Sequence, residues 1–343
     1  MPFEIVRNDI THMAVDVIVN TANPRPVIGY GTDSMIHEAA GPGLLQARQA
    51  IGNIARGSCA ITPAFALPAK YVIHTVGPVW LDGNHREETL LRSCYDSTLR
   101  LAMEYGCRSI AFPLISTGNY GFPQDKALQI AVSAFSAFLL EHDMHIYLVV
   151  FNREAFQLSK KLFHSVSSYI DQNYVDTYEF PILRSSREEY RPLRRRHPDA
   201  DMCGNAAPSD MLLPRAPMPK AASLEDILKQ EDTGFTEKLL ELIDKTGLKD
   251  SQIYKKANLS KQHFSKIRNN PAYKPSKPTA ISLALALELS LEETKDLIGR
   301  AGYALTNSSK FDLIIRYFIE QGNFNIIEIN ITLYEFDQPL LGS

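Results

Sequence analysis

Two glycine-rich segments of the sequence have the composition of anion-binding loops. The first, FPLISTGNYGFP at residues 112–123, leads from an apolar run into Ser-Thr-Gly-Asn-Tyr-Gly, just ahead of a helical pattern. Gly118 and Gly121 let the backbone turn and present N–H groups at close range, and the start of the helix adds the positive end of its dipole. Ser116 and Thr117 can add hydroxyl donors. This chemistry favours a phosphate ligand, and a tight turn without a ligand is the alternative.

The second segment, VDVIVNTANPRPVIGYGTDSMIHEAAGPG, spans residues 15–43. It reads as a strand that ends at Asn20, a loop that holds Gly29 and Gly31, and a helix that opens around Asp33. Two glycine loops that each follow a buried strand and lead into a helix can hold two faces of one pyrophosphate. Neither loop is a Walker A sequence or a G-x-G-x-x-G fingerprint. The sequence therefore argues against hydrolysis of nucleoside triphosphates.

These loops lie in a pattern of alternating strands and helices. Short β-branched runs occur at residues 3–6, 16–20, 71–77, 109–115 and 145–151, and helical patterns occur near 34–51, 87–106, 124–142 and 153–172. Nearly continuous apolar strands that alternate with helices predict an α/β sheet covered on both faces. Ligands of such sheets bind beyond the carboxyl ends of the strands, where loops and helix N-termini meet.

The composition sets wider limits. A chain of 343 residues favours two domains, and a net charge of −3 with 22% charged residues gives no whole-chain case for nucleic acid. The N-terminus lacks a signal pattern and no window approaches the ~20 apolar residues that span a bilayer, so we expect a cytoplasmic protein without a membrane partner. Four cysteines without a C-x-x-C spacing indicate neither a disulfide framework nor a zinc site.

Five motifs occur in order along the first half of the chain: NDIT (8–11), VNTAN (19–23), GYGTDSMIHEAAGP (29–42), YVIHTVGP (71–78) and FPLISTGNYGFP (112–123). In this order and spacing they resemble macrodomains, the ADP-ribose-binding fold, and most closely the MacroD-type branch. The resemblance implies a three-layer α/β/α sandwich with a mixed sheet. It also implies a hydrolase that removes mono-ADP-ribose from acidic side chains or deacylates O-acyl-ADP-ribose, with no cofactor and no metal.

Carried onto this chain, the resemblance assigns contacts to ADP-ribose. Asp9 would accept from the adenine amino group beside the backbone of Ile10, and Phe151 would stack on the adenine. From the residues alone, Asp9 would cap a turn ahead of Thr11, and Phe151 would be a core aromatic. The distal ribose and diphosphate would lie between two loops, formed by Asn23, Gly29, Tyr30 and Gly31 and by Ser116, Thr117, Gly118, Asn119, Tyr120, Gly121 and Phe122.

The same resemblance makes Asn23 and Asp33 the catalytic residues. In MacroD-type hydrolases, an aspartate ten positions after this asparagine positions or activates the attacking water. In an alternative, a substrate phosphate acts as the base and Asp33 orients the ribose. Independently of the family, a carboxylate can stabilise the cation-like ribosyl centre of an ADP-ribosyl ester while it holds water. Otherwise Asp33 would cap its helix, and His37, one turn on, would support it or be structural.

Tyr30 departs from the family pattern, which has a run of four glycines, valine and aspartate where this chain reads IGYGTD at 28–33. The ring could close over the distal ribose, narrow the choice of modified residue, or point to solvent. A module that binds ADP-ribose without turnover is the alternative to a hydrolase.

The composition changes after the α/β pattern. We expect a macrodomain at 1–180, a disordered linker rich in proline and arginine at 181–222, and a domain of about six helices at 223–343.

Part of this helical domain has a basic segment. No acidic residue lies between Asp250 and Glu288, whereas seven basic residues do: Lys255, Lys256, Lys261, Lys266, Arg268, Lys274 and Lys277. SQIYKKANLSKQHFSKI, at 251–267, resembles the helix-turn-helix of phage-repressor-like regulators. In such a motif Ser260 would cap a second helix that exposes Lys261, Gln262, Ser265, Lys266 and Arg268. The resemblance implies binding to DNA or RNA, and a bundle for protein contacts or regulation is the alternative.

Overall fold

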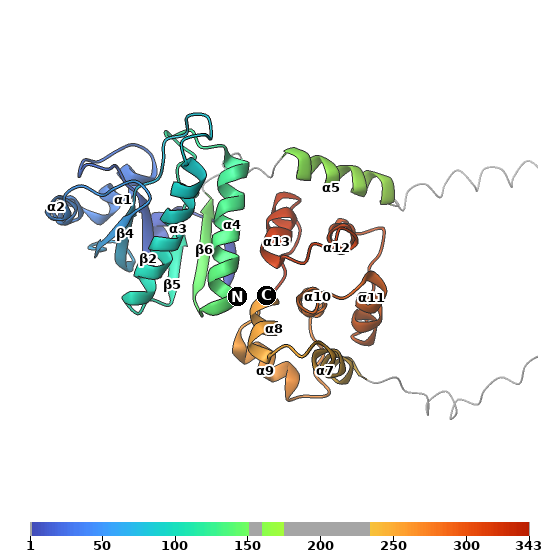
Figure 1. Ribbon diagram of the computed structural model, residues 1–343. Coiled ribbons are helices and arrows are strands. Elements are labelled where there is room, and N and C mark those ends of the chain that lie inside the picture. The colour runs from blue at the N-terminus through green and yellow to red at the C-terminus, as the bar shows by residue number, and fades with distance from the viewer. Residues whose placement is uncertain (1, 151–159, 175–233, 343) are drawn as a thin grey trace, which may run out of the picture. The chain divides into compact units, whose positions relative to one another are not determined.

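The computed structural model describes residues 2–150, 160–174 and 234–342 of the chain. These residues belong to one compact unit that contains a six-stranded sheet with its helices and a part that is helical throughout (Figure 1). The predicted α/β sandwich with an all-helical C-terminal part is therefore confirmed. No helix among the described residues is both long and apolar enough to cross a bilayer.

The predicted linker at 181–222 lies outside the described residues, and so do Phe151, Cys203 and the expected start of the helical domain at residue 223. The other three cysteines have free thiols.

The sheet has the strand order β1-β6-β5-β2-β4-β3, and all neighbouring strands are parallel except β3 and β4. Its strands are β1 (Phe3–Arg7), β2 (Val15–Thr21), β3 (Cys59–Pro63), β4 (Ala69–Thr75), β5 (Ser109–Phe112) and β6 (His145–Val150). Because β2 and β5 are parallel neighbours, the loops that follow them emerge side by side at one edge of the sheet. These are the two glycine-rich segments.

Helices cover both faces of the sheet (Figure 1). They are α1 (Thr32–Ala40) and α2 (Pro42–Ile51) on one face, and α3 (Glu87–Glu104) and α4 (Gln124–Glu141) on the other. Val17 and Val19 of β2 belong to the core with α3 and α4, whereas Ile18 between them belongs to the core with α1 and α2. Burial of both faces explains why the middle of this strand, residues 17–19, is a continuous apolar run.

Two features of the α/β part differ from the prediction. The single helix expected at 34–51 is interrupted, because Gly41 has a φ of 80° and Pro42 begins a new helix. β3 is absent from the predicted strands, because its sequence, CAITP, is short, only partly buried and closed by a proline at the sheet edge.

The helical part has seven helices among residues 234–342, where six helical patterns are expected. They are α7 (Phe235–Thr246), α8 (Asp250–Lys256), α9 (Lys261–Arg268), α10 (Lys277–Ala286), α11 (Leu291–Arg300), α12 (Lys310–Glu320) and α13 (Ile326–Glu335). The pattern at 249–270 forms two of them, and Ser260 caps α9 by accepting from the His263 N–H. Residues 279–286 of α10 are all buried, so this helix forms the centre of the helical part.

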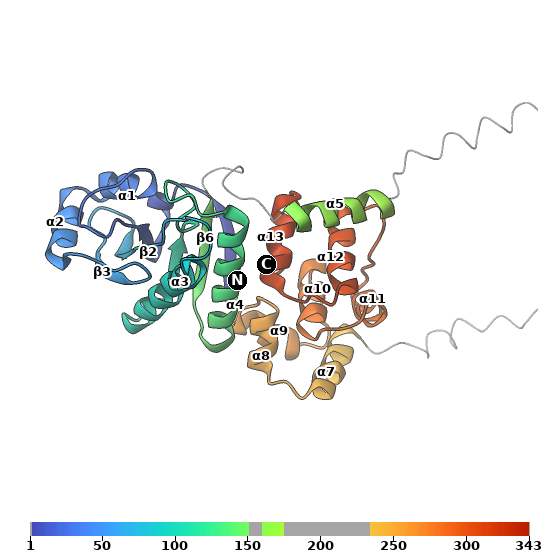
Figure 2. The same cartoon turned by 45° about the horizontal axis from the view of Figure 1, so that its top comes forward.

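α5 (Lys160–Asn173) packs with the helical part and not on a face of the sheet. Val166 and Ile170 are buried in the core that α7 to α12 share, and the Tyr169 hydroxyl donates to Glu320 of α12 at 2.8 Å. Both views show α5 beside α12 (Figure 2). The helix expected at 153–172 is thus present from residue 160 onward.

Candidate functional site

A cavity of about 270 Å³ opens at the carboxyl ends of β2, β5 and β6. Its walls are residues 21–23, 29–33, 77, 113–120, 149 and 150. Two glycine-rich loops that are far apart in the sequence therefore form opposite parts of one ligand-sized hollow, at the position where open α/β sheets bind ligands.

Asp33, the second residue of α1, lies in the cavity wall with a carboxylate that is fixed by donors. Its Oδ1 accepts from Nδ2 of Asn20 at 2.6 Å, and its Oδ2 accepts from the N–H of Gly29 at 2.5 Å. The residue is only 3% exposed. Its capping role is not observed, because the N-cap of α1 is Gly31 and no side chain bonds there. Donors on both oxygens hold the carboxylate in one orientation.

His37 lies one turn after Asp33 on the same buried side of α1. Its Nε2 is 3.5 Å from Oδ1 of Asp33. Burial lowers the pKa of His37 and outweighs the opposing attraction of Asp33, so the ring is neutral at neutral pH. A neutral imidazole can direct one N–H toward the carboxylate, which is the supporting contact expected from the sequence.

Asn23 connects the two loops. Its Nδ2 donates to the carbonyl oxygen of Val27 at 3.2 Å, and its Oδ1 is 3.4 Å from the hydroxyl of Tyr120, which donates to it. Gly29 lies between Asn23 and Asp33. A Cβ atom at Gly29 would be 2.8 Å from Nδ2 of Asn23 and 3.1 Å from Oδ2 of Asp33, so the loop can pass here only without a side chain.

Arg48 of α2 supports the Asn23 loop and is a residue that sequence reasoning missed. Its side chain is buried and donates to the carbonyl oxygens of Asn23 at 3.0 Å and Pro24 at 3.2 Å, and also to that of Gly52. A buried guanidinium that bonds three carbonyl groups restrains their loop strongly. In the sequence, Arg48 looks like an ordinary charged residue of an exposed helix face.

The loop at 116–120 offers unpaired backbone donors to the cavity. Ser116 has a φ of 66°, which turns the chain sharply after β5. Further along the loop, the N–H of Phe122 donates to the carbonyl oxygen of Ser116 at 3.0 Å. The N–H of Gly121 donates to the carbonyl oxygen of Gly118 at 2.9 Å. Within the part of the chain that the structure describes, the N–H groups of residues 116–120 bond no protein acceptor. They are therefore free to bind an anion.

Two other predicted ligand residues, Gly121 and Phe122, are not part of the cavity wall. Their amides close the loop, and the Phe122 ring is buried edge-on against Trp80, with ring centroids 4.7 Å apart. Tyr30 contributes to the wall, but the residue is 86% exposed, so its ring points to solvent and does not cover the cavity.

Asp9 and Ile10 also lie outside the cavity wall. Asp9 caps the short 3-10 turn η1 (Ile10–His12), because its Oδ1 accepts from the N–H of Thr11 at 2.9 Å and from the Thr11 hydroxyl at 2.8 Å. Ile10 is buried. Their contacts to adenine, like that of Phe151, stay predictions.

One group of side chains outside the cavity has the composition of a cation site. Asp82, His85 and Glu87 place one ligand atom each within 4.8 Å of one another. The Glu87 carboxylate, however, already accepts from the backbone N–H groups of residues 81, 82, 83 and 85. This carboxylate anchors the loop before α3.

The basic segment of the helical part is less positive than its sequence indicates. α9 exposes Lys261, Gln262, Ser265, Lys266 and Arg268, as predicted. Four of the seven basic residues form ion pairs, however: Lys255 with Asp143, Lys256 with Glu288, Arg268 with Asp250 and Lys277 with Asp312. The expectation of seven unopposed charges is therefore wrong, because carboxylates outside the segment fold back onto it.

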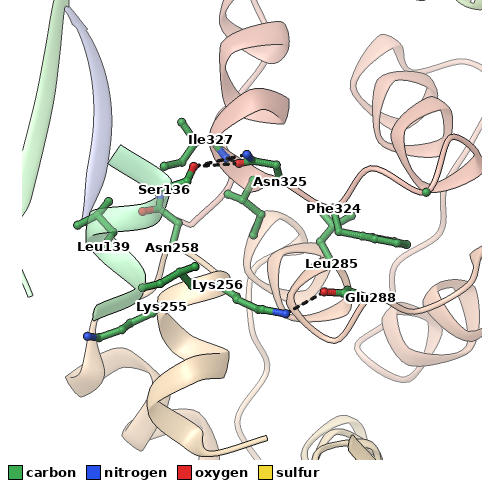
Figure 3. A pocket seen from close by; sticks show the side chains of 13 residues that line it. Ser136, Leu139, Lys255, Lys256, Asn258, Leu285, Glu288, Phe324, Asn325 and Ile327 are labelled. Carbon is green, nitrogen blue, oxygen red and sulfur yellow. Dashed lines mark hydrogen bonds and ion pairs between the residues drawn. The ribbon is translucent and has the colours of Figure 1, made fainter. Parts of the chain in front are cut away.

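A second cavity, of about 350 Å³, lies between α4 and the helices α8, α10 and α13 (Figure 3). Among its polar side chains, Lys256 pairs with Glu288 at 2.8 Å and Ser136 with Asn325 at 3.4 Å, whereas Lys255 and Asn258 pair with groups outside the wall. The remaining wall is largely apolar, and no carboxylate is held there as Asp33 is. The cavity at the strand ends is therefore the candidate active site.

Comparison with known proteins identifies the family of this chain. The family model described as Macro domain matches residues 19–131. A Macro domain-containing protein of Methanosarcina mazei is 46% identical over 159 residues, which cover 46% of this chain and 85% of the relative. The O-acetyl-ADP-ribose deacetylase of Escherichia coli K12 is 46% identical over 164 residues, which cover 46% of this chain and 93% of that enzyme. The chain belongs to the macrodomain family.

Solved structures of the family are also similar to this chain. The Oceanobacillus iheyensis macrodomain with ADP is 38% identical, with a TM-score of 0.44 and coverage of 50% of this chain and 92% of that one. The Trypanosoma brucei macrodomain in complex with ADP-ribose is 39% identical, with a TM-score of 0.42 and coverage of 45% and 66%.

Proposed function

We propose that the macrodomain hydrolyses esters that join ADP-ribose to a carboxylic acid. Two substrate classes share this bond: O-acyl-ADP-ribose, and protein Asp or Glu side chains that carry mono-ADP-ribose. Several relatives of 46 to 48% identity are named O-acetyl-ADP-ribose deacetylase. The observation that carries the proposal is the Asp33 carboxylate, fixed by Asn20 and Gly29 in the wall of a cavity with free backbone donors.

The diphosphate would lie between the free N–H groups of residues 116–120 and the N-terminus of α1. Both are sources of partial positive charge that favour an anion. Asn23, Gly29 and Gly31 would line the distal ribose. Asp9, Ile10 and Phe151 would receive the adenine beyond the cavity wall. Tyr30 leaves the distal end open, which allows a substrate as large as a protein side chain.

In the reaction on an ADP-ribosylated side chain, water attacks the anomeric carbon of the distal ribose, and the bond from this carbon to the carboxylate oxygen breaks. The water leaves its hydroxyl on the ribose and its proton passes to the departing carboxylate, so ADP-ribose and a carboxylic acid are released. Asp33 is placed to hold the water and to stabilise positive charge on the ribosyl centre. If a substrate phosphate takes the proton of the water, Asp33 orients the ribose for attack. In both routes, the rate depends on the fixed position of this carboxylate.

The test is a turnover assay with O-acetyl-ADP-ribose, and in parallel with a glutamate-linked ADP-ribosylated protein. Asp33→Asn should lower kcat by roughly a hundredfold or more while ADP-ribose still binds by calorimetry. Glu38→Gln, an exposed change on the same helix, is the matched control and should retain activity. Wild-type protein that binds ADP-ribose but releases no product would instead identify a reader.

For the helical part we propose a role in protein contacts, with nucleic-acid binding as the alternative. Ion pairing of four basic residues supports this choice, since it leaves Lys261, Lys266 and Lys274 as the cations of the segment without a carboxylate partner among the described residues. Fluorescence anisotropy with a DNA duplex tests it. We expect weak binding that the triple exchange of these lysines to glutamine does not change. Loss of tight, salt-dependent binding in that variant would establish the alternative.

A further inference from the structure

A row of buried polar side chains runs across the sheet and ends at Asp33. Thr62 of β3, His74 of β4 and Asn20 of β2 are 4%, 0% and 0% exposed. Oγ1 of Thr62 is 3.0 Å from Nε2 of His74, and Nδ1 of His74 is 3.1 Å from Nδ2 of Asn20. That same Nδ2 donates to Asp33 at 2.6 Å. The row therefore connects the sheet edge to the candidate catalytic carboxylate, through three strands.

Strand register creates this row. β2 and β4 are parallel with Asn20 opposite His74, and β3 pairs with β4 so that Thr62 lies two residues from the partner of His74. Side chains at these positions point to one face of the sheet, which is the face that α1 covers.

The donors and acceptors of the row allow only one arrangement in which the Asp33 carboxylate accepts from Asn20. The amide of Asn20 must present its NH₂ to the carboxylate, because its oxygen would face a second oxygen at 2.6 Å. The NH₂ then also faces Nδ1 of His74, which must accept. The His74 proton is therefore on Nε2, where Thr62 accepts it.

Burial keeps His74 in this neutral form. It lowers the pKa of His74 to about 3. The positive charge of Arg48 also lowers this pKa, and the neighbouring His37 has the same effect. The His37 and His74 rings are 6.1 Å apart. A proton on Nδ1 would place one donor against another and would turn the Asn20 amide, so that its oxygen faced Asp33.

We propose that His74 is a positioning residue: with Thr62 it fixes the orientation of the Asn20 amide, and through that amide the orientation of Asp33. This inference rests on the proposed function. A row that served stability alone would be expected to satisfy its own polar atoms, yet Oδ1 of Asn20 has no hydrogen-bond partner. The amide oxygen of Asn20 thus stays without a hydrogen bond, while its NH₂ group donates to both His74 and Asp33.

The mildest test is Thr62→Val, which removes the acceptor of the Nε2 proton and keeps the shape of the side chain. Thr98→Val is the matched control, because Thr98 is also buried but lies in α3, on the other face of the sheet, where its hydroxyl does not bond the row. His74→Leu removes the link to Asn20, and His74→Asn returns an acceptor near the Nδ1 position. All variants are made in the full chain. Readouts are kcat, KM, ADP-ribose affinity and the ¹⁵N spectrum of the histidine rings.

We expect the spectrum of the wild type to show His74 neutral with its proton on Nε2. Thr62→Val should change that spectrum and lower kcat roughly tenfold, with KM and ADP-ribose affinity within about threefold of the wild type. Thr98→Val should change neither the histidine spectrum nor kcat. His74→Leu should lower kcat further, and His74→Asn should recover part of the loss.

A His74 ring that is cationic, or protonated on Nδ1, would overturn the proposal. So would a Thr62→Val protein with a changed spectrum and unchanged kcat, or one whose kcat and ADP-ribose affinity fall together, as a general loss of structure would cause. If the wild type turns over no ester while its spectrum shows the Nε2 proton, the proposed function fails and the orientation of Asn20 stands.

Discussion

The N–H of Gly29 donates to Oδ2 of Asp33 at 2.5 Å, so the loop before α1 and the carboxylate within α1 fix each other. The contact is possible only because Gly29 has no side chain in the narrow space between Asp33 and Asn23. The glycine of this loop thus has two functions, since it lets the chain pass and it binds the carboxylate.

Gly29→Ala should therefore damage catalysis more than stability. The added Cβ would lie 2.8 Å from Nδ2 of Asn23 and 3.1 Å from Oδ2 of Asp33, so both side chains must move. We expect kcat for O-acetyl-ADP-ribose to fall by roughly tenfold to a hundredfold, because small displacements of catalytic groups are costly. Gly299→Ala, with nothing within 4 Å of the new Cβ, is the control and should keep the wild-type rate. Equal rates in the two variants would contradict the close packing of Gly29.

The substitution Asn20→Asp should both destabilise the protein and abolish its turnover. It replaces a donor by a carboxylate at 2.6 Å from that of Asp33, at a position where Asn20 is fully buried and Asp33 is only 3% exposed. Like charges at this distance cannot both ionise at little cost, so we expect the free energy of unfolding to fall by roughly 3 kcal/mol or more and kcat to be lost. Urea denaturation at neutral pH measures the first effect. A variant as stable as the wild type would show that Asn20 does not face Asp33.

Five of the six strands and the two loops could be predicted from the sequence, because continuous apolar runs and glycine patterns are local signals, whereas the short edge strand β3 has no such run. The row from Thr62 to Asn20 could not, since it depends on the register of β3, β4 and β2, and no single segment carries that information. The charge of the basic segment was overestimated for the same reason. Asp143 and Asp312, which neutralise two of its lysines, are distant in the sequence.

The stability of the protein should depend on pH through His74. Its pKa is lowered from 6.5 to about 3 in the folded protein. Between these two pH values, His74 therefore binds a proton in the unfolded chain but not in the folded chain. The contribution of His74 to the free energy of unfolding is fully present above about pH 6.5. It is lost as the pH falls toward 3, by about 1.4 kcal/mol per pH unit. His37, whose pKa is also lowered, adds to the loss.

Urea denaturation of the wild type and His74→Asn at about pH 6.5 and about pH 5 measures this contribution. The wild type should lose about 2 kcal/mol more than the variant over that interval. The same loss in both proteins would mean that His74 is protonated in the folded state, or that other groups carry the whole dependence.

Asn258, in the turn between α8 and α9, should matter for stability and not for the chemistry of the site. Its Oδ1 accepts from the N–H of Phe3 at 3.0 Å, and its Nδ2 donates to the Phe3 carbonyl at 3.1 Å. The side chain thus extends the hydrogen bonding of the edge strand β1. Asn258→Ala leaves two buried backbone groups unpaired and should lower the free energy of unfolding by about 2 to 4 kcal/mol.

The backbone of Asn258 has a φ of 54°, which asparagine tolerates and alanine does not, so Asn258→Gly separates this strain from the lost bonds. We expect Asn258→Gly to be as destabilised as Asn258→Ala, or nearly so, if the two bonds to Phe3 dominate. Asn269→Ala, at an exposed position of the same region, is the control. Wild-type stability of Asn258→Gly would show that the conformation of the turn matters and that the contact to β1 contributes little.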